Sequence, residues 1–544
     1  MSHLFRKVVL FLVFLIAVLQ IIHMTLMSRL ESRTNNIKKN HLNRQRKNSD
    51  NHEEFKNKNN NYEQNVLYSI DQVDIEREKI YKSLQSLSSV LDSSGEYRIL
   101  HFISTADLLK NSRWRYSIVN KLDTLDGNHL YKKNDLSIAT HSTVTQLYNL
   151  DLLSRIWNGP ISLAIFAVSI QQLPIVVETI LLLRYCNPSI RQRTSFHLVY
   201  PLNFSSKLNN HQVRSVLDFL RWPEIKKLYP EFDRFVQKEN CGHIKQLIEQ
   251  IDQKGDHNFS QKQQQSSFAN NYNHHVPYPN NLLRNIARRY SLTEYTLVID
   301  IDLVPSKLLY EKFLEFIQNS RLFKDTDFLN NDKQLRQSPN TFDDNRTGKN
   351  SDVLIVFVLP TFEIDLELAR KQHKHLGVED IDQIIPTDKI NLIHAIEQRY
   401  VRPFYIELCW KCHKYTEYEA WLHSHRLVNY SSPNSSYNDD KLQILYQVQW
   451  HDPWEPFYIS RNNVPFYDER FRQYGFNRIS QTCELNMAGY QFAVLNDAFL
   501  IHRGFKTTDD FHPTKDAELE HNRILYRKFK LQLKERYSYS GRKC

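Results

Sequence analysis

Short apolar runs alternate with helical patterns in the chain from about residue 97 onward. The runs are rich in β-branched and aromatic residues, which are typical of strands, and they lie at 97–103, 161–168, 196–201, 296–301 and 353–359. Between several of them, apolar residues recur at helical spacing, as at 174–185 and 281–290. Strands that alternate with helices predict an α/β fold with a mixed, mostly parallel sheet, and we expect it to form one large domain over 97–544.

Two polar segments interrupt this domain. Residues 255–275 are rich in Gln, Asn and His, and residues 325–350 are rich in Asn and Asp. Neither segment has enough apolar residues to build a core, so both are predicted to be surface insertions.

A longer apolar run lies near the N-terminus. Residues 8–27 contain no Asp, Glu, Lys or Arg, and their length fits one membrane crossing. No cleavage site of small residues follows, which favours an uncleaved signal anchor over a removed signal peptide. We therefore predict a cytosolic tail at 1–7 and a transmembrane anchor at 8–27 in the type II orientation, although more Lys and Arg follow the run than precede it.

Residues 28–96 are predicted to be a lumenal stem. Its first part, 35–65, is polar and lacks the apolar content to fold alone. Apolar residues then fall at helical spacing, which predicts a helix that either pairs two chains or packs on its own domain; they are Val73, Ile80, Leu84, Leu87 and Leu91. The formal net charge is +10 and much of the excess lies in the stem, but no nucleic-acid motif accompanies it, so a solvated linker is the better interpretation.

Five glycosylation sequons and six cysteines favour a lumenal location. The sequons begin at Asn203, Asn258, Asn345, Asn429 and Asn434. An even number of cysteines permits disulfides in a lumenal protein, although the sequence does not give their pairing. The run 409–413, Cys-Trp-Lys-Cys-His, matches a haem-attachment string and half of a zinc site, but no partner segment completes either. A redox-active pair is the other alternative, but no thioredoxin-like context surrounds the run, so we predict a structural role as disulfides or buried thiols.

The candidate chemistry centres on Asp300 and Asp302, which follow an apolar run. Alternate residues of a strand share a face, so the two carboxylates can point the same way. Converging carboxylates are costly unless a cation holds them, and such oxygen ligands suit Mn²⁺ or Mg²⁺. Ligands of α/β sheets bind at the carboxyl ends of strands, where this pair lies. His502, which follows another short apolar run, is the candidate third ligand.

Aromatic residues lie beside a carboxylate at Trp454 and Glu455. Sugar sites often combine aromatic faces with acids, although ordinary core packing explains the pattern equally well.

Longer motifs give this chain a resemblance to the LARGE-type family of Golgi glycosyltransferases. The residues that carry it are the Asp-x-Asp segment 298–306, the preceding helical segment 278–287, and the segments 409–415, 464–481, 499–506 and 511–544. The resemblance covers about 97–544 apart from the two insertions, and it leaves room for one catalytic domain.

The resemblance implies a GT-A fold and a defined reaction. The expected enzyme is a single-pass type II protein of the Golgi membrane. It transfers glucuronate from UDP-glucuronate, with inversion and in β-1,4 linkage, to a xylose-terminated O-mannosyl glycan of the α-dystroglycan type. Mn²⁺, with Mg²⁺ as the alternative, is expected on Asp300, Asp302 and His502. Two alternative functions stay open: a transferase that uses another UDP-sugar as donor, and an inactive lumenal glycan-binding protein. The assembly state is open as well, with a homodimer or a complex with other Golgi transferases as the possibilities.

The resemblance also suggests candidate substrate contacts and a region in which to look for the catalytic base. Phosphate or glucuronate contacts are expected from Arg284, Asn285, Arg503 and Lys506, and further substrate contacts from Trp454, Glu455 and Asn477. Inversion needs a base on the acceptor hydroxyl. Related galactosyltransferases place acids after a Gly-rich turn, but here Gly475 is followed by Phe-Asn-Arg; Asp468 is therefore the preferred candidate base, with Glu469 and Glu484 as the others.

Overall fold

The computed structural model describes residues 75, 89–107, 132–168, 172–202, 241–242, 246, 276–320, 354–373, 384–430, 441–508 and 513–544. The chain divides into two compact units, Met1–Asp74 and Ile75–Cys544, and every described residue belongs to the second. The predicted tail, anchor and insertions and most of the predicted stem lie outside the described residues. Among the residues that are described, no helix combines the length and apolar character needed to cross a membrane.

A large mixed sheet forms the centre of the Ile75–Cys544 unit. Its strands, in spatial order, are β1 (Ser89–Leu91), β2 (Tyr97–Ser104), β5 (Thr194–Pro201), β4 (Ile161–Phe166), β3 (Lys132–Thr143), β6 (Thr293–Val298), β12 (Phe457–Arg461), β8 (Ile355–Leu359), β13 (Gln491–Leu495) and β11 (Ile444–Val448). Parallel pairing is concentrated in β5–β4–β3–β6 and in β8–β13, while β12 runs antiparallel to both of its neighbours. The predicted α/β fold with a mixed sheet is confirmed.

Helices cover both faces of the parallel strands because successive residues of these strands point to opposite faces and apolar side chains occupy both. Ile138, Leu163 and Leu297 pack in one cluster with α5 (Asn149–Ile156), α6 (Leu173–Cys186), α7 (Pro188–Arg193) and α13 (Leu309–Asn319). Their neighbours Ala139, Ala164 and Val298 face the other way and pack with Leu282, Leu283 and Ile286 of α12 (Asn280–Arg289). This alternation is what a strand buried on both faces requires.

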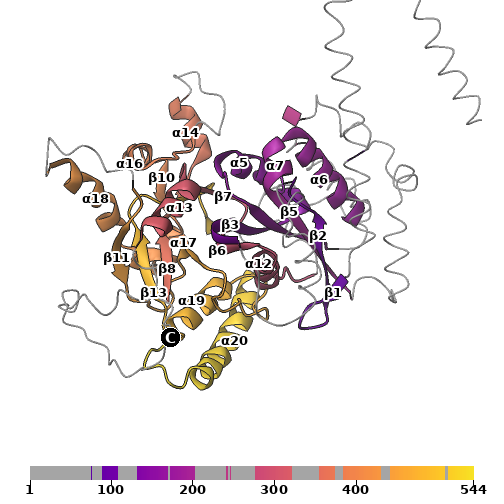
Figure 1. Ribbon diagram of the computed structural model, residues 1–544. Helices are drawn as coiled ribbons and strands as arrows, with labels where there is room; N and C mark the ends of the chain where they lie inside the picture. Colours follow the sequence, from indigo (N-terminus) through magenta and orange to yellow (C-terminus); the bar gives the residue numbers. More distant parts are fainter. Residues whose placement is uncertain are drawn as a thin grey trace, which may run out of the picture. The chain divides into compact units, whose positions relative to one another are not determined.

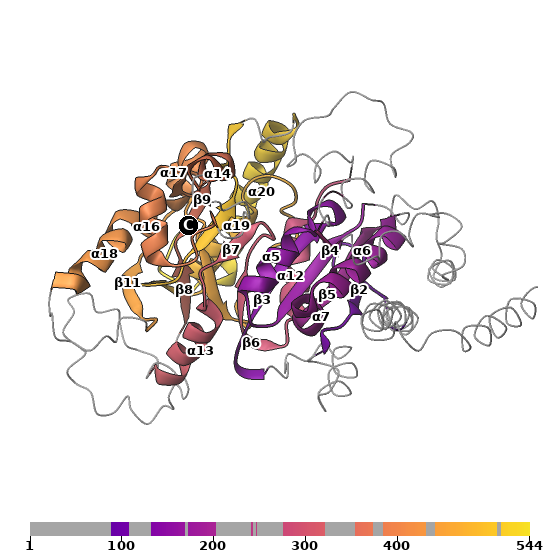
Figure 2. The ribbon, with the colours of Figure 1, turned by 90° about the horizontal axis from the view of Figure 1, so that it is seen from above.

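A second, smaller sheet holds the strands β10 (Val401–Pro403), β9 (Thr361–Ile364), β14 (Leu500–Arg503) and β7 (Leu303–Pro305). Around it and the far half of the large sheet lie the remaining helices: α14 (Leu366–His373), α16 (Lys389–Glu397), α17 (Ile406–His413), α18 (Tyr418–Tyr430), α19 (Asn477–Met487) and α20 (Lys515–Arg536), with short 3₁₀ turns η1 (Val144–Gln146) and η9 (Lys414–Thr416). In both ribbon views the purple strands with α5, α6 and α7 occupy one side of this unit and the orange helices α16, α17 and α18 the other (Figure 1, Figure 2).

The strand and helix predictions held at most positions. Strands β2, β4, β5, β6 and β8 and helices α6 and α12 lie where the apolar patterns placed them. The helix predicted to end at Leu91 is wrong there, because Ser89–Leu91 forms β1 and pairs antiparallel with β2. The hairpin that joins them turns at Gly95, whose φ of +73° suits glycine. The sheet therefore begins before the predicted boundary at residue 97.

All six cysteines form disulfides. The pairs are Cys186–Cys241, Cys409–Cys412 and Cys483–Cys544. Cys409 and Cys412 of the 409–413 run are paired with each other, as the disulfides predicted there require, and the structural role itself stays a prediction.

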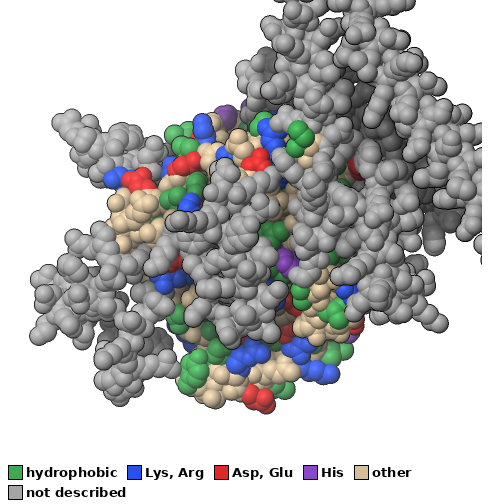
Figure 3. Space-filling view, turned by 45° about the vertical axis from the view of Figure 1, so that its right-hand side comes forward, with side chains coloured by type: hydrophobic (Ala, Val, Ile, Leu, Met, Phe, Trp, Pro, Cys, Tyr) green, Lys and Arg blue, Asp and Glu red, His purple; other side chains and the backbone are tan. Residues whose placement is uncertain are grey.

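The surface of the described part mixes both signs of charge. Figure 3 shows Lys and Arg side chains along the lower edge of the described surface, with acidic side chains among them. α20, the lowest labelled helix in Figure 1, alternates the two types along its length, for example at Glu520 and Arg523, which form an ion pair. Such a face is typical of a solvated helix.

Candidate active site

A cavity of about 540 Å³ lies beside the point where the order of the parallel strands in the sheet reverses, between β3 and β6. Along the chain, β3, β4 and β5 extend the sheet one way, and β6 then joins β3 on the opposite edge. Ligands of open α/β sheets bind at this switch point, beyond the carboxyl ends of the strands. His141, near the end of β3, and Asp300, just after β6, both line the cavity. We call this cavity the central pocket.

Charged side chains from distant segments meet in the central pocket. The charged and titratable residues that line it include His141, Arg284, Asp300, Asp302, Glu455, Arg478, His502, Lys506, Lys515 and Asp516. Seven residues predicted from sequence are thus brought together: Asp300, Asp302, His502, Arg284, Glu455, Asn477 and Lys506.

Asp300 is held by three side chains. Arg284 Nη2 donates to Oδ1 at 3.1 Å, Arg478 Nη2 donates to Oδ2 at 2.7 Å, and His141 Nε2 lies 3.2 Å from Oδ1. Burial alone would raise the pKa of Asp300, but the charges of Arg478 and Arg284 outweigh it and hold the pKa well below its usual value. Asp300 is therefore ionised at neutral pH.

Asp302 and His502 meet because two strands pair across the small sheet. In the pairing of β7 with β14, His502 lies opposite Leu303, the residue after Asp302. His502 Nε2 lies 3.0 Å from Asp302 Oδ2, and His502 Nδ1 lies 2.7 Å from the Gly504 carbonyl oxygen. Although burial opposes ionisation, His502 lowers the pKa of Asp302 to about 2.

The donor set at Asp302 fits a cation. A carbonyl oxygen only accepts, so the hydrogen bond to Gly504 assigns a proton to Nδ1 of His502. In the neutral ring, Nε2 then carries a lone pair directed at a carboxylate, an arrangement that a bound cation would stabilise. Asp302 Oδ1 is buried and has no hydrogen-bond partner, so this oxygen is a second atom that could coordinate a cation.

Within the described residues, no group of three or more His, Cys, Asp and Glu side chains is gathered tightly enough to hold a metal ion. Asp302 and His502 form a close pair, whereas Asp300 is directed at Arg284 and Arg478. Asp300 and Asp302 follow the end of β6 and lie in the turn before β7, so this turn, rather than strand alternation, places both in one pocket.

Three predicted substrate contacts have structural roles in place of pocket positions. Asn285 Nδ2 donates to the Tyr467 carbonyl and to Glu469 Oε1. The Arg503 guanidinium donates to Asn149 Oδ1 at 2.7 Å. Trp454 is fully buried. None of the three lines the central pocket.

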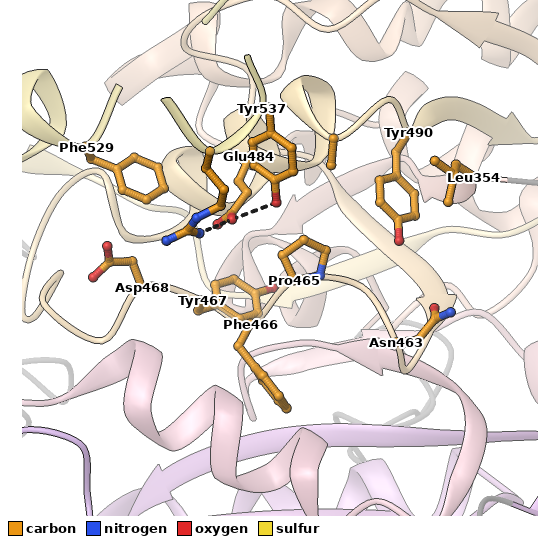
Figure 4. Close-up of a pocket in the computed structure, with 12 residues that line it drawn as sticks. Leu354, Asn463, Pro465, Phe466, Tyr467, Asp468, Glu484, Tyr490, Phe529 and Tyr537 are labelled. Atoms are coloured by element: carbon orange, nitrogen blue, oxygen red, sulfur yellow. Dashed lines mark hydrogen bonds and ion pairs between the residues drawn. The ribbon is translucent and has the colours of Figure 1, made fainter. Parts of the chain in front are cut away.

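The three candidate bases also lie outside the central pocket. Asp468 and Glu484 line a separate cavity of about 600 Å³, the side pocket, drawn in Figure 4. Asp468 forms an ion pair with Arg470, and Glu484 Oε1 accepts from Arg536 Nη1 at 2.5 Å and from the Tyr537 hydroxyl at 3.0 Å. Glu469 accepts from Ser93 and Asn285. Because their carboxylates are engaged away from the central pocket, we do not carry these acids forward as bases.

Among the pocket residues that the sequence reasoning missed are two that bind Asp300. Arg478 lies in the first turn of α19 and packs over the Phe457 ring at 3.9 Å while it bonds Asp300. His141 lies near the carboxyl end of β3 and bonds the Tyr278 hydroxyl at 2.8 Å. A run of polar residues at the end of an apolar strand, 140–143, was the available signal for His141.

A glycine shapes the segment before Arg478. Gly475 has φ of +91°, and a Cβ atom there would lie 2.6 Å from Leu519 Cδ1. The backbone turns at this point so that α19 begins at Asn477 and directs Arg478 into the central pocket.

Of the five predicted glycosylation sites, only the backbone of one lies within the described residues. Asn429 falls within α18, and its side chain is outside the described set. Asn203, Asn258, Asn345 and Asn434 lie outside the described residues.

The switch point of the sheet thus holds an acidic and basic pocket suited to an anionic ligand, and the match to a family of glycosyltransferases shows that the chain is a glycosyltransferase. A family model described as "Glycosyl-transferase for dystroglycan" matches residues 135–538, and the chain belongs to this family. The resemblance found from the motifs is confirmed.

Individual relatives agree with the family assignment. The zebrafish (Danio rerio) protein named beta-1,4-glucuronyltransferase 1 is 31% identical over 542 residues, which cover 99% of this chain and 98% of the relative. The human protein of the same name is 33% identical over 476 residues, covering 88% of this chain and 87% of the relative. The mouse protein named xylosyl- and glucuronyltransferase LARGE1 is 25% identical over 271 residues, or 49% of this chain and 28% of that relative.

Proposed function

We propose that this chain is an inverting β-1,4-glucuronyltransferase. In this proposal it moves glucuronate from UDP-glucuronate to a xylose-terminated glycan of the O-mannosyl type that α-dystroglycan carries. The names of the zebrafish and human relatives support the donor and linkage, and the description of the family supports the acceptor class. We further propose that the chain works as a type II protein of the Golgi membrane, anchored by residues 8–27.

The observation that carries the proposal is the charge arrangement of the central pocket. The donor brings a diphosphate and a sugar carboxylate, all anionic, and the pocket holds Arg284, Arg478, Lys506 and Lys515. Arginine side chains bind carboxylate and phosphate oxygens through paired hydrogen bonds. The backbone N–H of Lys506 donates to the buried Glu363, which fixes the segment that carries this lysine.

A divalent cation, Mn²⁺ or Mg²⁺, is proposed on Asp302 and His502, with Asp300 as the further ligand. Such an ion would neutralise charge on the departing UDP. The chain's own residues would hold the site open: Gly504 fixes the ring of His502, and Asp302 keeps one buried oxygen for the ion. Arg284 and Arg478 would place positive charge beside the diphosphate.

The test is transfer by the full-length chain in detergent, with a xylose-terminated acceptor and a panel of UDP-sugars. We expect UDP-glucuronate to be the preferred donor and EDTA to abolish transfer, with Mn²⁺ restoring it. Binding of Mn²⁺ to the protein without donor, followed by electron paramagnetic resonance, gives a readout independent of turnover. Preference for UDP-xylose or UDP-N-acetylglucosamine would overturn the donor assignment, and absence of transfer from every donor would favour a glycan-binding protein.

A further inference from the structure

The segment 450–455, which leads into β12, is fixed by hydrogen bonds from three directions. Trp454 N–H donates to the His451 carbonyl at 2.7 Å, and the Trp454 indole donates to Thr416 Oγ1 at 3.1 Å. The Trp454 carbonyl accepts from the Trp450 indole at 2.9 Å and from the Thr482 hydroxyl at 3.0 Å. These bonds order the backbone directly before the residue that follows.

Glu455 follows Trp454, and only its backbone takes part in this network. Its N–H donates to the Cys412 carbonyl at 2.9 Å, while its carboxylate lines the central pocket. The nearest basic group to that carboxylate in an ion-pair geometry is His413, whose Nε2 lies 3.9 Å from Oε1, and the Glu455 side chain is 18% exposed. A carboxylate is thus held toward the pocket on a rigid backbone, with no close cationic partner among the described residues.

The surroundings of Glu455 keep it able to accept a proton. Burial lowers the pKa of His413 to about 3, so that ring is neutral at pH 7 and gives Glu455 no compensating charge. Arg478 of α19 and Arg284 of α12 lower the pKa of Glu455, Asp300 raises it, and Tyr474 also faces it. Burial is the largest effect and raises the pKa of Glu455 to about 7.

The acids of the central pocket are therefore divided by their environments. Asp300 and Asp302 stay ionised far below neutral pH, as phosphate and cation chemistry requires. Glu455 lies near neutrality, where a carboxylate both accepts a proton and releases it readily. Pairs of carboxyl groups separated in this way mark different roles in one site.

We propose that Glu455 is the general base of the transfer reaction. The inference rests on the proposed function and names the residue that completes it. The acceptor hydroxyl loses its proton to a carboxylate oxygen of Glu455, and its oxygen forms a bond to the anomeric carbon of the donor sugar. The bond from that carbon to the diphosphate breaks, and UDP leaves with the electron pair. The proton on Glu455 is then released to solvent through the open side of the pocket.

The experiment compares Glu455→Gln with Asp468→Asn in the full-length chain. Both changes replace a carboxylate by its amide, and Asp468 lies in the side pocket. We expect Glu455→Gln to lower kcat at least about 100-fold, the usual contribution of a general base, with the KM for the donor nearly unchanged. Asp468→Asn should keep transfer within about twofold of wild type, because the Asp468 carboxylate pairs with Arg470 and does not line the central pocket.

A pH profile separates a base from a merely structural residue. The kcat of the wild type should rise with pH through about 7, because Glu455 must be deprotonated to act. Glu455→Asp retains a carboxylate set back by one methylene, and it should keep part of the activity together with the rising limb. The residual activity of Glu455→Gln should lack that limb.

The outcomes distinguish the inference from the proposed function. Transfer by Glu455→Gln at the wild-type rate, or a larger loss in Asp468→Asn, would overturn the role of Glu455 and leave the glucuronyltransferase assignment standing. Loss of transfer in Glu455→Gln, with a donor other than UDP-glucuronate preferred by the wild type, would support the base and overturn the donor. A wild-type chain that transfers no sugar would overturn both.

Discussion

Two glutamates, Glu455 and Glu484, each line a pocket but differ in their partners. Burial raises the pKa of both. Glu484 bonds Arg536 and Tyr537 in the side pocket, where Figure 4 shows the labelled side chains of Glu484 and Tyr537 directed toward each other. Glu455 makes no such bond in the central pocket and instead faces it with an open carboxylate. Burial alone therefore does not mark a reactive acid, and the proposed role of Glu455 rests on its facing a pocket without a close partner.

Helix α19 connects the two environments. Arg478 in its first turn faces Asp300 in the central pocket, and Glu484 farther along faces the side pocket. Changes in the central pocket should thus alter turnover with little effect on folding, and changes in the side pocket should do the opposite.

The largest effect on turnover is expected at Asp302. Asp302→Asn should lower transfer at least about 1,000-fold, about 4 kcal/mol of transition-state stabilisation, because it removes the carboxylate proposed to hold the cation. The amide can still donate to His502 Nε2, so Tm should change by less than about 3 °C. Assays of transfer and thermal unfolding on one preparation check both halves.

Asp388→Asn provides the matched control. Asp388 caps α16 by accepting from the Asn391 N–H, and asparagine is an equally good cap. Transfer by this variant should stay within about twofold of wild type. Equal losses in Asp302→Asn and Asp388→Asn would remove the metal site from the account.

A smaller effect is expected on stability as a function of pH. The folded pKa of Glu455, about 7, exceeds the ordinary value of 4.5, so the folded state binds more protons between these values. The contribution of Glu455 to stability is therefore fully present below pH 4.5 and is lost as pH rises through about 7, by at most about 3 kcal/mol.

Urea unfolding of wild type and Glu455→Gln across pH 4.5 to 7.5 measures this contribution. The free energy of unfolding of the wild type should fall relative to that of the variant as pH rises. Parallel curves for the two proteins would show that the pKa of Glu455 is not raised by folding. The contrast between Glu455 and the two aspartates of lowered pKa, Asp300 and Asp302, would then be wrong.

The smallest effect is expected in the side pocket. Arg536→Ala leaves the buried Glu484 with one partner fewer and should cost about 1–2 kcal/mol of stability, less than a fully buried pair because the Arg536 side chain is 59% exposed. Transfer should be unaffected. Adding Glu484→Gln should recover part of the loss, and a transfer defect that accompanies it would show that the two pockets are coupled.

The sequence predicted the scaffold better than the chemistry on it. Strands β4 to β6 are read from local apolar runs, and Asp300, Asp302 and His502 stand at the ends of such runs, so their shared pocket follows from strand topology. The role proposed for Glu455 as the base was not predictable in this way. Whether an acid has a partner depends on contacts such as Glu484 with Arg536, 52 residues apart, which no local pattern contains.

The same limit explains the misplaced substrate residues. Asn285 and Arg503 belong to convincing motifs, yet their side chains turn to Tyr467 and Asn149 on other segments. Arg478, by contrast, lies in a motif that was noticed and reaches the pocket because Gly475 allows the chain to turn before α19. Direction of a side chain is set by packing, and packing is a property of the whole fold.

The bond between Cys483 and Cys544 has a mechanical consequence. It joins residues 61 positions apart, and β13, β14 and α20 all lie inside the loop it closes. Force applied to the end of the chain would pass through the disulfide directly to α19, so β13, β14 and α20 would carry none of it. A molecule stretched in an optical trap should accordingly release about 200 Å of extra contour length only after a reductant is added.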